Sequence, residues 1–528
     1  MNHRTFKVLA AAGTLMVLAA AGCTNTTEQP TSTVTAANIF NDPNAYQQLL
    51  ARVYAGLAIS GQQGPSGNAD IQGIDEGFSQ YLRLYWECEE LPTDEAVIGW
   101  GDIGLPEMNT MTWTSSSRMV VAMYYRMELQ ATMANEFLRQ TTDAALASRN
   151  VSAPLKAQIQ TWRAEARFLR ALSYYHGLDL FGNIPLVTEN DPIGGAPPKQ
   201  AKAADIYAFL VSELTAIRTQ LPVGNTSANY GRATQAAADM LLAELYLNDS
   251  VYTGSTAWAS AAASATNVIG AGYSMPANYA TNFMADNKSS PEIIFLVESN
   301  GTYTQTWGGT TFIVHAACGG SMSASTYGID YCWGGTRLKP EAYNNFSAGD
   351  NRAFAFDTVG QSVQVTNISD FTKGVANPKF SNKTSGGASG SNPTFVDTNF
   401  PVWRLAEAYL IRAEADVRLG GAANLTQALA DVNLVRERAY GGAAGDITAA
   451  QLTLPFILAE RGRELLWEAH RRTDLVRFGQ FAGPQATYTW SWEGGVAAGQ
   501  KQPAYYNLYP LPATELVANP NLKQNPGY

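Results

Sequence analysis

The strongest constraint on the fold is a set of segments with helical periodicity at both ends of the chain. Apolar side chains recur there every third or fourth residue, as at Ile159, Trp162, Ala166 and Leu169, which is the spacing of one helix face. Small residues punctuate these segments and would let neighbouring helices approach closely, as paired-helix repeats require. We therefore expect a mainly α-helical fold built on a tetratricopeptide-like scaffold of helical pairs. The predicted helices cover about residues 44–60, 119–140, 155–180, 203–220, 233–248, 256–270, 402–419, 425–439 and 453–479.

The middle of the chain has a different character. Residues 275–400 are rich in Gly, Ser, Thr and Asn and contain short β-like runs such as 293–297. A smaller loop region covers residues 61–115. On a helical scaffold, contact residues tend to lie in loops of this kind. The sequence thus predicts a helical part at 41–274, a loop-rich ligand-binding part at 275–400 and a second helical part at 401–528.

The N-terminus has the features of an export signal. Residues 1–22 combine a basic start with an apolar run from Val8 to Ala21, as in a secretory signal peptide. The string from Ala20 to Cys23 resembles a bacterial lipobox, although Ala20 stands where Leu is usual. We expect a lipid on Cys23 and a flexible tether over residues 23–40, with cleavage as a plain signal peptide as the alternative. No later segment is long and apolar enough to cross a bilayer.

The cysteines fit an extracytoplasmic, oxidising compartment. Cys318 and Cys332 are 14 positions apart and could form a disulfide there. Cys88 would then remain as a buried thiol.

Several classes of function find little support. The formal net charge of −10 argues against a nucleic-acid binder, which needs a basic face. Residues 99–104 match G-x-G-x-x-G, the pattern of a dinucleotide-binding loop. No helix is expected to begin there, and the flanking segments do not alternate between predicted strands and helices, so we expect no dinucleotide cofactor. The pairs of acidic residues are adjacent in sequence, which does not indicate two carboxylates across a cleft. Without metal-ligand spacings or a nucleophile motif, we expect no metal and no enzyme.

Aromatic residues among small polar ones are the strongest chemical cue. Flat rings suit the apolar C–H faces of sugars, and the loops carry several such rings beside Gly, Ser, Thr and Asp. The alternative is that these rings fill a small second core. Asp102 and Arg337 would hydrogen-bond sugar hydroxyls. The predicted ligand-binding residues are Trp100, Asp102, Trp307, Tyr327, Tyr331, Trp333 and Arg337.

Charged residues within the predicted helices have a structural interpretation. Glu464, Glu468 and Arg472 are spaced four apart, as on one helix face, and Glu414 and Arg418 form an i, i+4 pair. The arginines at 163, 167 and 170 would pair with carboxylates between helices or snorkel.

Strings distributed along the chain carry a family resemblance. The string at 460–478 and the tail are the most specific. Together they resemble the SusD/RagB family of nutrient-binding outer-membrane lipoproteins. The strings are RAEARFLRALSYY (163–175), LFGNIPLVTE (180–189), WRLAEAYLIRAEA (403–415), ERGRELLWEAHRRTDLVRF (460–478), YPLPATEL (509–516) and NPNLKQNPGY (519–528).

The resemblance implies a helical scaffold carrying an irregular ligand-binding part. It also implies a partner, a SusC-like TonB-dependent outer-membrane transporter, to which the protein would hand oligosaccharide from the cell surface. Anchored in the outer membrane by its lipid, the protein would face the cell exterior. A RagB-like peptide binder and a purely structural lid of the transporter remain alternatives.

Overall fold

The structure is a computed structural model that describes residues 39–224 and 226–528. Residues 46–528 form one compact unit, and the chain up to Ala45 is a separate one. The predicted signal peptide and the predicted lipid site at Cys23 lie outside the described residues. Within the described ranges, no helix combines the length and the apolar character needed to span a bilayer.

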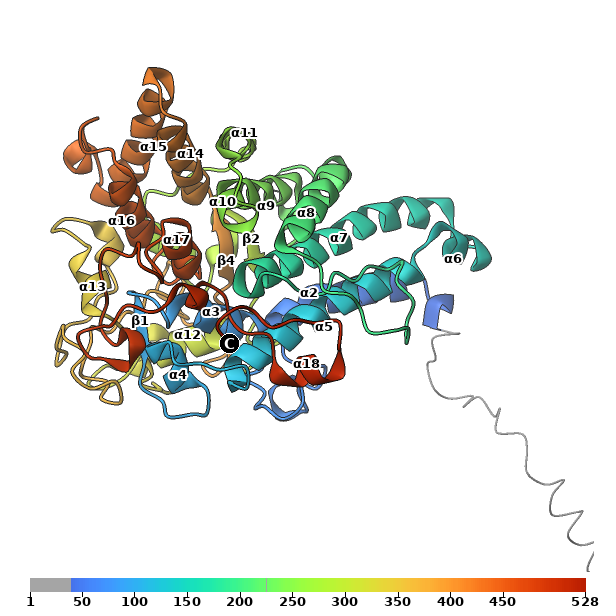
Figure 1. Cartoon of the computed structure of the whole chain (residues 1–528), viewed down its shortest axis with the longest axis horizontal. Coiled ribbons are helices and arrows are strands. Elements are labelled where there is room, and N and C mark those ends of the chain that lie inside the picture. Colours follow the sequence, from blue (N-terminus) through green and yellow to red (C-terminus); the bar gives the residue numbers. More distant parts are fainter. Residues whose placement is uncertain (1–38, 225) are drawn as a thin grey trace, which may run out of the picture. The chain divides into compact units, whose positions relative to one another are not determined.

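Helices dominate the compact unit (Figure 1). The longer ones lie close to the ranges that the periodicity predicts. The α-helices are α2 (Ala45–Ala58), α3 (Tyr81–Glu90), α4 (Leu105–Thr110), α5 (Arg118–Gln140), α6 (Asp143–Ser148), α7 (Ala153–Phe181), α8 (Ala203–Ile217), α9 (Gln235–Leu247), α10 (Asp249–Tyr252), α11 (Trp258–Ile269), α12 (Gly309–Ala316), α13 (Pro340–Asn344), α14 (Leu405–Leu419), α15 (Ala422–Tyr440), α16 (Leu454–Glu464), α17 (Arg471–Arg477) and α18 (Ala513–Ala518). The strands are β1 (Ala96–Ile98), β2 (Ile293–Val297), β3 (Thr336–Leu338) and β4 (Phe400–Arg404).

The longer helices pack against one another in neighbouring pairs. Helix α7 contacts both α5 and α8, while α11 contacts α9 and α14, and α14 contacts α15. Alanines such as Ala237, Ala243 and Ala413 are fully buried in these contacts, which allows close approach of the helix axes. The mainly α-helical fold is therefore confirmed.

Ion pairs hold these helices together from inside. Arg167 and Arg170 on α7 both bind Glu213 on α8, Arg167 through a contact of 2.6 Å. Arg477 on α17 binds Glu414 on α14 at 2.8 Å. These charges link helices, as the sequence predicts for the arginines of α7. Pairs of this kind are costly to break because the remaining charge would be buried without a partner.

The helix predicted over residues 453–479 is wrong in its middle. The segment breaks between α16 and α17, where Trp467 and Ala469 have φ values of 62° and 63°. The backbone N–H groups of these two residues donate to Glu95 Oε2 and Glu90 Oε1, at 3.1 and 2.6 Å. Buried carboxylates from α3 and the segment after it therefore replace helical acceptors and stabilise the break.

This break also separates Glu464, Glu468 and Arg472, which do not share one helix face. Arg404 donates to both glutamates, at 3.0 Å to Glu464 and 2.6 Å to Glu468. Arg472 instead donates to Asp179 at 2.9 Å.

The loop region predicted over residues 61–115 is wrong for α3. All residues of this helix except Tyr85 are buried. The helix has only ten residues, which is short for a periodicity argument, and its buried side chains include the charged residues Arg83, Glu87, Glu89 and Glu90, which a sequence alone would place on the surface.

Two small antiparallel sheets tie the loop-rich part to the helices. Strand β1 pairs with β3, and β2 pairs with β4. Each pair joins segments more than 100 positions apart in sequence. The β1–β3 pair determines the position of the site described next.

Candidate functional site

Strands β1 and β3 bring two tryptophans together. Ile98 lies opposite Thr336 in the register, and the backbone N–H of Gly99 extends the pairing by donating to Gly335 O at 2.9 Å. Trp100 follows the end of β1 and Trp333 precedes the start of β3. The indole Nε1 of Trp100 approaches the carbonyl oxygen of Trp333 at 3.4 Å.

A third tryptophan joins them from the segment before α12. The backbone N–H of Trp307 donates to Glu76 Oε2 at 3.0 Å, and the hydroxyl of Thr306 donates to the other oxygen of Glu76 at 2.8 Å. The ring of Trp307 packs on Phe395, with 4.8 Å between ring centroids, and remains 37% exposed.

The three indoles form a continuous series with Trp333 in the centre. Trp100 and Trp307 each lie 6.2 Å from Trp333, and each is inclined to it by 47°. All three side chains keep part of their surface open to solvent. We call Trp100, Trp307 and Trp333 the tryptophan platform. Three inclined, partly exposed rings offer a stepped apolar surface rather than a flat one.

Gly335 makes room for the Trp100 ring. A Cβ built on Gly335 would lie 2.7 Å from two atoms of that indole. A side chain here would therefore displace the ring or the strand. This requirement is visible only in three dimensions, because Gly335 is one of many glycines in the loop-rich part.

His315 packs against Trp333, the central ring of the platform. Its imidazole stacks on Trp333 with ring centroids 4.6 Å apart, while Nδ1 lies 2.7 Å from Tyr331 O and Nε2 lies 3.0 Å from Thr394 O. Burial lowers the pKa of His315, against the opposing influence of the two carbonyls and of Asp330. The sequence carries no signal for this role, since an isolated histidine in a loop-rich segment has no distinguishing pattern around it.

A disulfide joins Cys318 to Cys332, next to Trp333. The same segment is held by backbone N–H groups of Trp333 and Gly334, which donate to His315 O and Cys318 O at 2.9 and 2.7 Å. The central ring is therefore fixed by covalent, hydrogen-bonding and stacking contacts. Cys88 is a buried free thiol.

Arg83 on α3 packs beside the platform, although no motif in the sequence points to it. Its guanidinium lies over Phe78 and Phe312, at 3.8 and 4.1 Å, and within 5.6 Å of the Trp100 ring centroid. Asp102 is exposed. Glu87 accepts from Arg83 at 2.8 Å. Burial raises the pKa of Glu87, while Arg83 lowers it and the charge of Asp102 raises it.

The remaining predicted contact residues lie in different environments. Tyr331 is 70% exposed beside Cys332, whereas Tyr327 is half-buried, and burial raises its pKa. Arg337 is fully buried and donates to three backbone carbonyls, those of Gly335, Ile368 and Lys373. Its role is to hold loops together, so we leave it out of the ligand site.

One group of side chains in the described residues could hold a metal ion by distance, formed by Glu244, Glu407 and His470. Arg461 already supplies positive charge there, because its Nη2 lies 3.2 Å from Glu407 Oε1. A cation would add to the charge of this guanidinium, so we assign no metal to the group.

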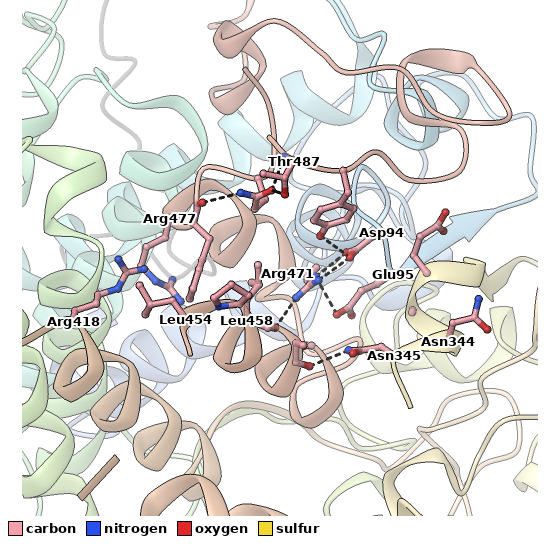
Figure 2. Close-up of a pocket in the computed structure, with 18 residues that line it drawn as sticks. Asp94, Glu95, Asn344, Asn345, Arg418, Leu454, Leu458, Arg471, Arg477 and Thr487 are labelled. Atoms are coloured by element: carbon pink, nitrogen blue, oxygen red, sulfur yellow. Dashed lines mark hydrogen bonds and ion pairs between the residues drawn. The ribbon is translucent and has the colours of Figure 1, made fainter. Parts of the chain in front are cut away.

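A hollow of about 700 Å³ lies between α13, α16 and the segment after α17. Figure 2 shows that its polar groups mostly engage one another: Arg471 binds Asp94 through two contacts of 2.7 Å, and Tyr488 donates to Asp94 at 3.0 Å. Asn345 likewise donates to Ala459 O at 2.9 Å. With these groups satisfied internally, the hollow has few free partners for a ligand, and the tryptophan platform remains the better candidate.

Comparisons with known proteins point in one direction. A family model described as "SusD family" matches residues 361–528. The starch-binding protein SusD of Bacteroides thetaiotaomicron is 33% identical over 534 residues, which cover 91% of this chain and 92% of that protein.

Solved structures share the fold. A SusD superfamily protein from Bacteroides thetaiotaomicron has a TM-score of 0.70 at 20% identity, covering 92% of this chain and 99% of that one. A laminarin-binding SusD-like protein has a TM-score of 0.69 at 22% identity, with the same coverage of both chains. At these identities the likeness concerns the fold alone.

Proposed function

Because this chain belongs to the SusD family, we propose that it binds a glycan on the tryptophan platform and does not alter it chemically. The observation that carries this proposal is the contiguous series Trp100, Trp333 and Trp307, with successive rings 6.2 Å apart and partly open to solvent. Covering about 50–80 Å² of each ring would contribute about 1–2 kcal/mol. Two or three such rings, less the cost of association, correspond to dissociation constants of about mM to µM.

The inclination of the rings favours an α-glucan within the glycan class. Each step along the platform changes the ring plane by 47°. A coiled, starch-type α-glucan turns successive sugar faces by a substantial angle, whereas an extended, cellulose-type β-glucan presents a flatter ribbon. The starch-binding relative, 33% identical over nearly the whole chain, supports the same choice. Asp102, exposed beside the platform, is the proposed hydrogen-bonding partner for sugar hydroxyls, and Tyr331 is a further exposed ring.

The location of the protein at the cell surface and its transporter partner are also proposals. We expect a lipid on Cys23, display at the outer face of the outer membrane, and delivery of the glycan to a SusC-like TonB-dependent transporter. Labelling with a radioactive fatty acid, lost in a Cys23→Ala variant, and co-purification with a large barrel protein would test these two points.

Affinity electrophoresis of residues 24–528 in gels containing amylopectin, dextran, laminarin or no polysaccharide tests the ligand class. We expect retardation by amylopectin above all. Retardation by laminarin alone would replace the α-glucan by a β-glucan. Binding of peptides in calorimetry, with none of the polysaccharides bound, would overturn the proposal in favour of a peptide binder.

A further inference from the structure

A second hollow lies in the helical part of the chain, between α2, α7 and the segment that leads into α9. Its volume is about 890 Å³, within the range of ligand pockets in proteins. It shares no lining residue with the tryptophan platform. We call it the α2–α7 hollow.

The walls of this hollow are fixed by one buried carboxylate. Glu165 on α7 accepts a hydrogen bond of 2.6 Å from the hydroxyl of Tyr54 on α2 and binds the guanidinium of Arg232. The same Tyr54 oxygen accepts the backbone N–H of Ala233 at 2.9 Å. Both helices and the segment before α9 are thus linked through Glu165, so the shape of the hollow exists before any ligand enters.

The lining is nearly neutral and rich in amides. Among the described residues that line it, only Glu165 and Arg232 are charged, and they are paired with each other. The half-buried indole of Trp162 and the ring of Tyr54 supply apolar faces. Amide groups surround them on several elements: Gln47, Gln158, Gln220, Asn229 and Gln235.

Two of these amides have no partner in the described part of the chain. The exposed side chains of Gln47 on α2 and Gln158 on α7 form no hydrogen bond with other described residues, whereas Gln220 and Gln235 donate to backbone carbonyls. An amide offers both donors and an acceptor, which matches the hydroxyl pairs of a sugar. A charged ligand would find no free counter-charge here, and a purely apolar ligand would leave the amides without partners.

We propose that the α2–α7 hollow is a second, independent binding site for a neutral oligosaccharide, with Trp162 as its stacking ring and Gln47 and Gln158 as its hydrogen-bonding groups. This inference rests on the proposed glycan binding for the choice of ligand. Two sites on one chain would let a long polysaccharide be held at two points, which raises its apparent affinity without new contacts at either site.

The test uses a variant that preserves the fold. Gln47→Ala combined with Gln158→Ala removes both amides from exposed positions of the hollow, and Gln48→Ala, on the neighbouring exposed position of α2 outside the lining, is the control. We expect calorimetry with maltoheptaose to give two ligands per wild-type chain and one per double variant. The apparent dissociation constant for amylopectin should rise about tenfold or more in the double variant and stay unchanged in the control.

The same titration separates this inference from the proposed function. In Trp100→Ala, Trp333→Ala one maltoheptaose should remain bound, and combining all four substitutions should abolish binding. A stoichiometry of one in the wild type, abolished by the tryptophan substitutions and unaffected by the two glutamine substitutions, would overturn the second site while leaving the platform intact. Binding abolished by the two glutamine substitutions alone would overturn the platform instead, and binding of no glycan would overturn both.

Discussion

The indole of Trp333 lies almost parallel to the imidazole of His315, with 4.6 Å between ring centroids and 26° between planes. Each nitrogen of the histidine lies within 3.0 Å of a carbonyl oxygen of a flanking loop, and the single N–H of a neutral imidazole can donate to one of them. The central ring of the tryptophan platform therefore rests on a side chain that is itself held between two loops. A rigid platform loses little conformational entropy on binding, which favours affinity.

Replacing His315 by alanine should weaken glycan binding about tenfold, because Trp333 loses its stacking partner and the flanking loops lose their polar contacts with the imidazole. Calorimetry with maltoheptaose measures the change. His176→Ala, another buried histidine, hydrogen-bonded to Tyr81 in the helical part, should lower the melting temperature but leave the affinity unchanged. Equal losses of affinity in both variants would mean that general destabilisation, and not support of Trp333, causes the effect.

Gly335→Ala should also weaken binding by about tenfold or more, because its methyl group would displace the Trp100 ring. Gly386→Ala is the control: its Cβ would lie 3.9 Å from its nearest neighbour, the Thr384 hydroxyl. The affinity for maltoheptaose and the melting temperature together distinguish a local displacement from unfolding. Unchanged affinity in Gly335→Ala would show that the position of Trp100 does not matter.

Removal of the disulfide should affect stability and binding together. Converting Cys318 and Cys332 to serine opens a loop with a sequence separation of 14, for which the lost stabilisation is about 3 kcal/mol. We expect a lower free energy of unfolding in denaturant titration and weaker binding, since Trp333 follows Cys332. A reducing agent should reproduce this change in the wild type and have no effect on the double serine variant; an effect there would contradict the assignment.

Glu244 predicts a pH dependence of stability. Burial, with a further contribution from Glu407, raises the pKa of Glu244 to about 8 in the folded chain, against about 4.3 for an exposed glutamate. The folded state thus binds the proton more tightly than the unfolded state, and the stability from this group is lost as the pH rises from about 4.3 towards 8.

A Glu244→Gln variant does not titrate at this position and can still donate to Glu407. The difference between its melting temperature and that of the wild type should increase by a few degrees from pH 5 to pH 8, as followed by circular dichroism. The melting temperature of Glu298→Gln, a substitution on an exposed side chain, should change with pH as that of the wild type does. If the melting temperature of Glu244→Gln changed with pH as that of the wild type does, Glu244 would be ionised in the folded wild-type chain.

The sequence predicted the helical frame better than the details of the site. Long helices such as α7 and α14 repeat apolar residues at helical spacing over many turns, and Trp100, Trp307 and Trp333 could be recognised as ring residues among small polar neighbours. Local periodicity could not reveal α3, which has only ten residues and buries charged side chains, or the break at Trp467, which depends on Glu90 and Glu95. The same holds for Arg337, whose carbonyl partners come from loops distant in sequence.

The most direct test of the account is a titration of maltoheptaose and amylopectin into Trp100→Ala, Trp333→Ala. Loss of two rings, at about 1–2 kcal/mol each, predicts a loss of affinity at the platform of about 25-fold or more, estimated from about 1.4 kcal/mol per factor of ten. Trp258→Ala on α11, a half-buried tryptophan outside the platform, should bind as the wild type does. Wild-type affinity for both ligands in the double variant, with the fold intact by circular dichroism, would contradict the central claim that these inclined indoles hold the glycan.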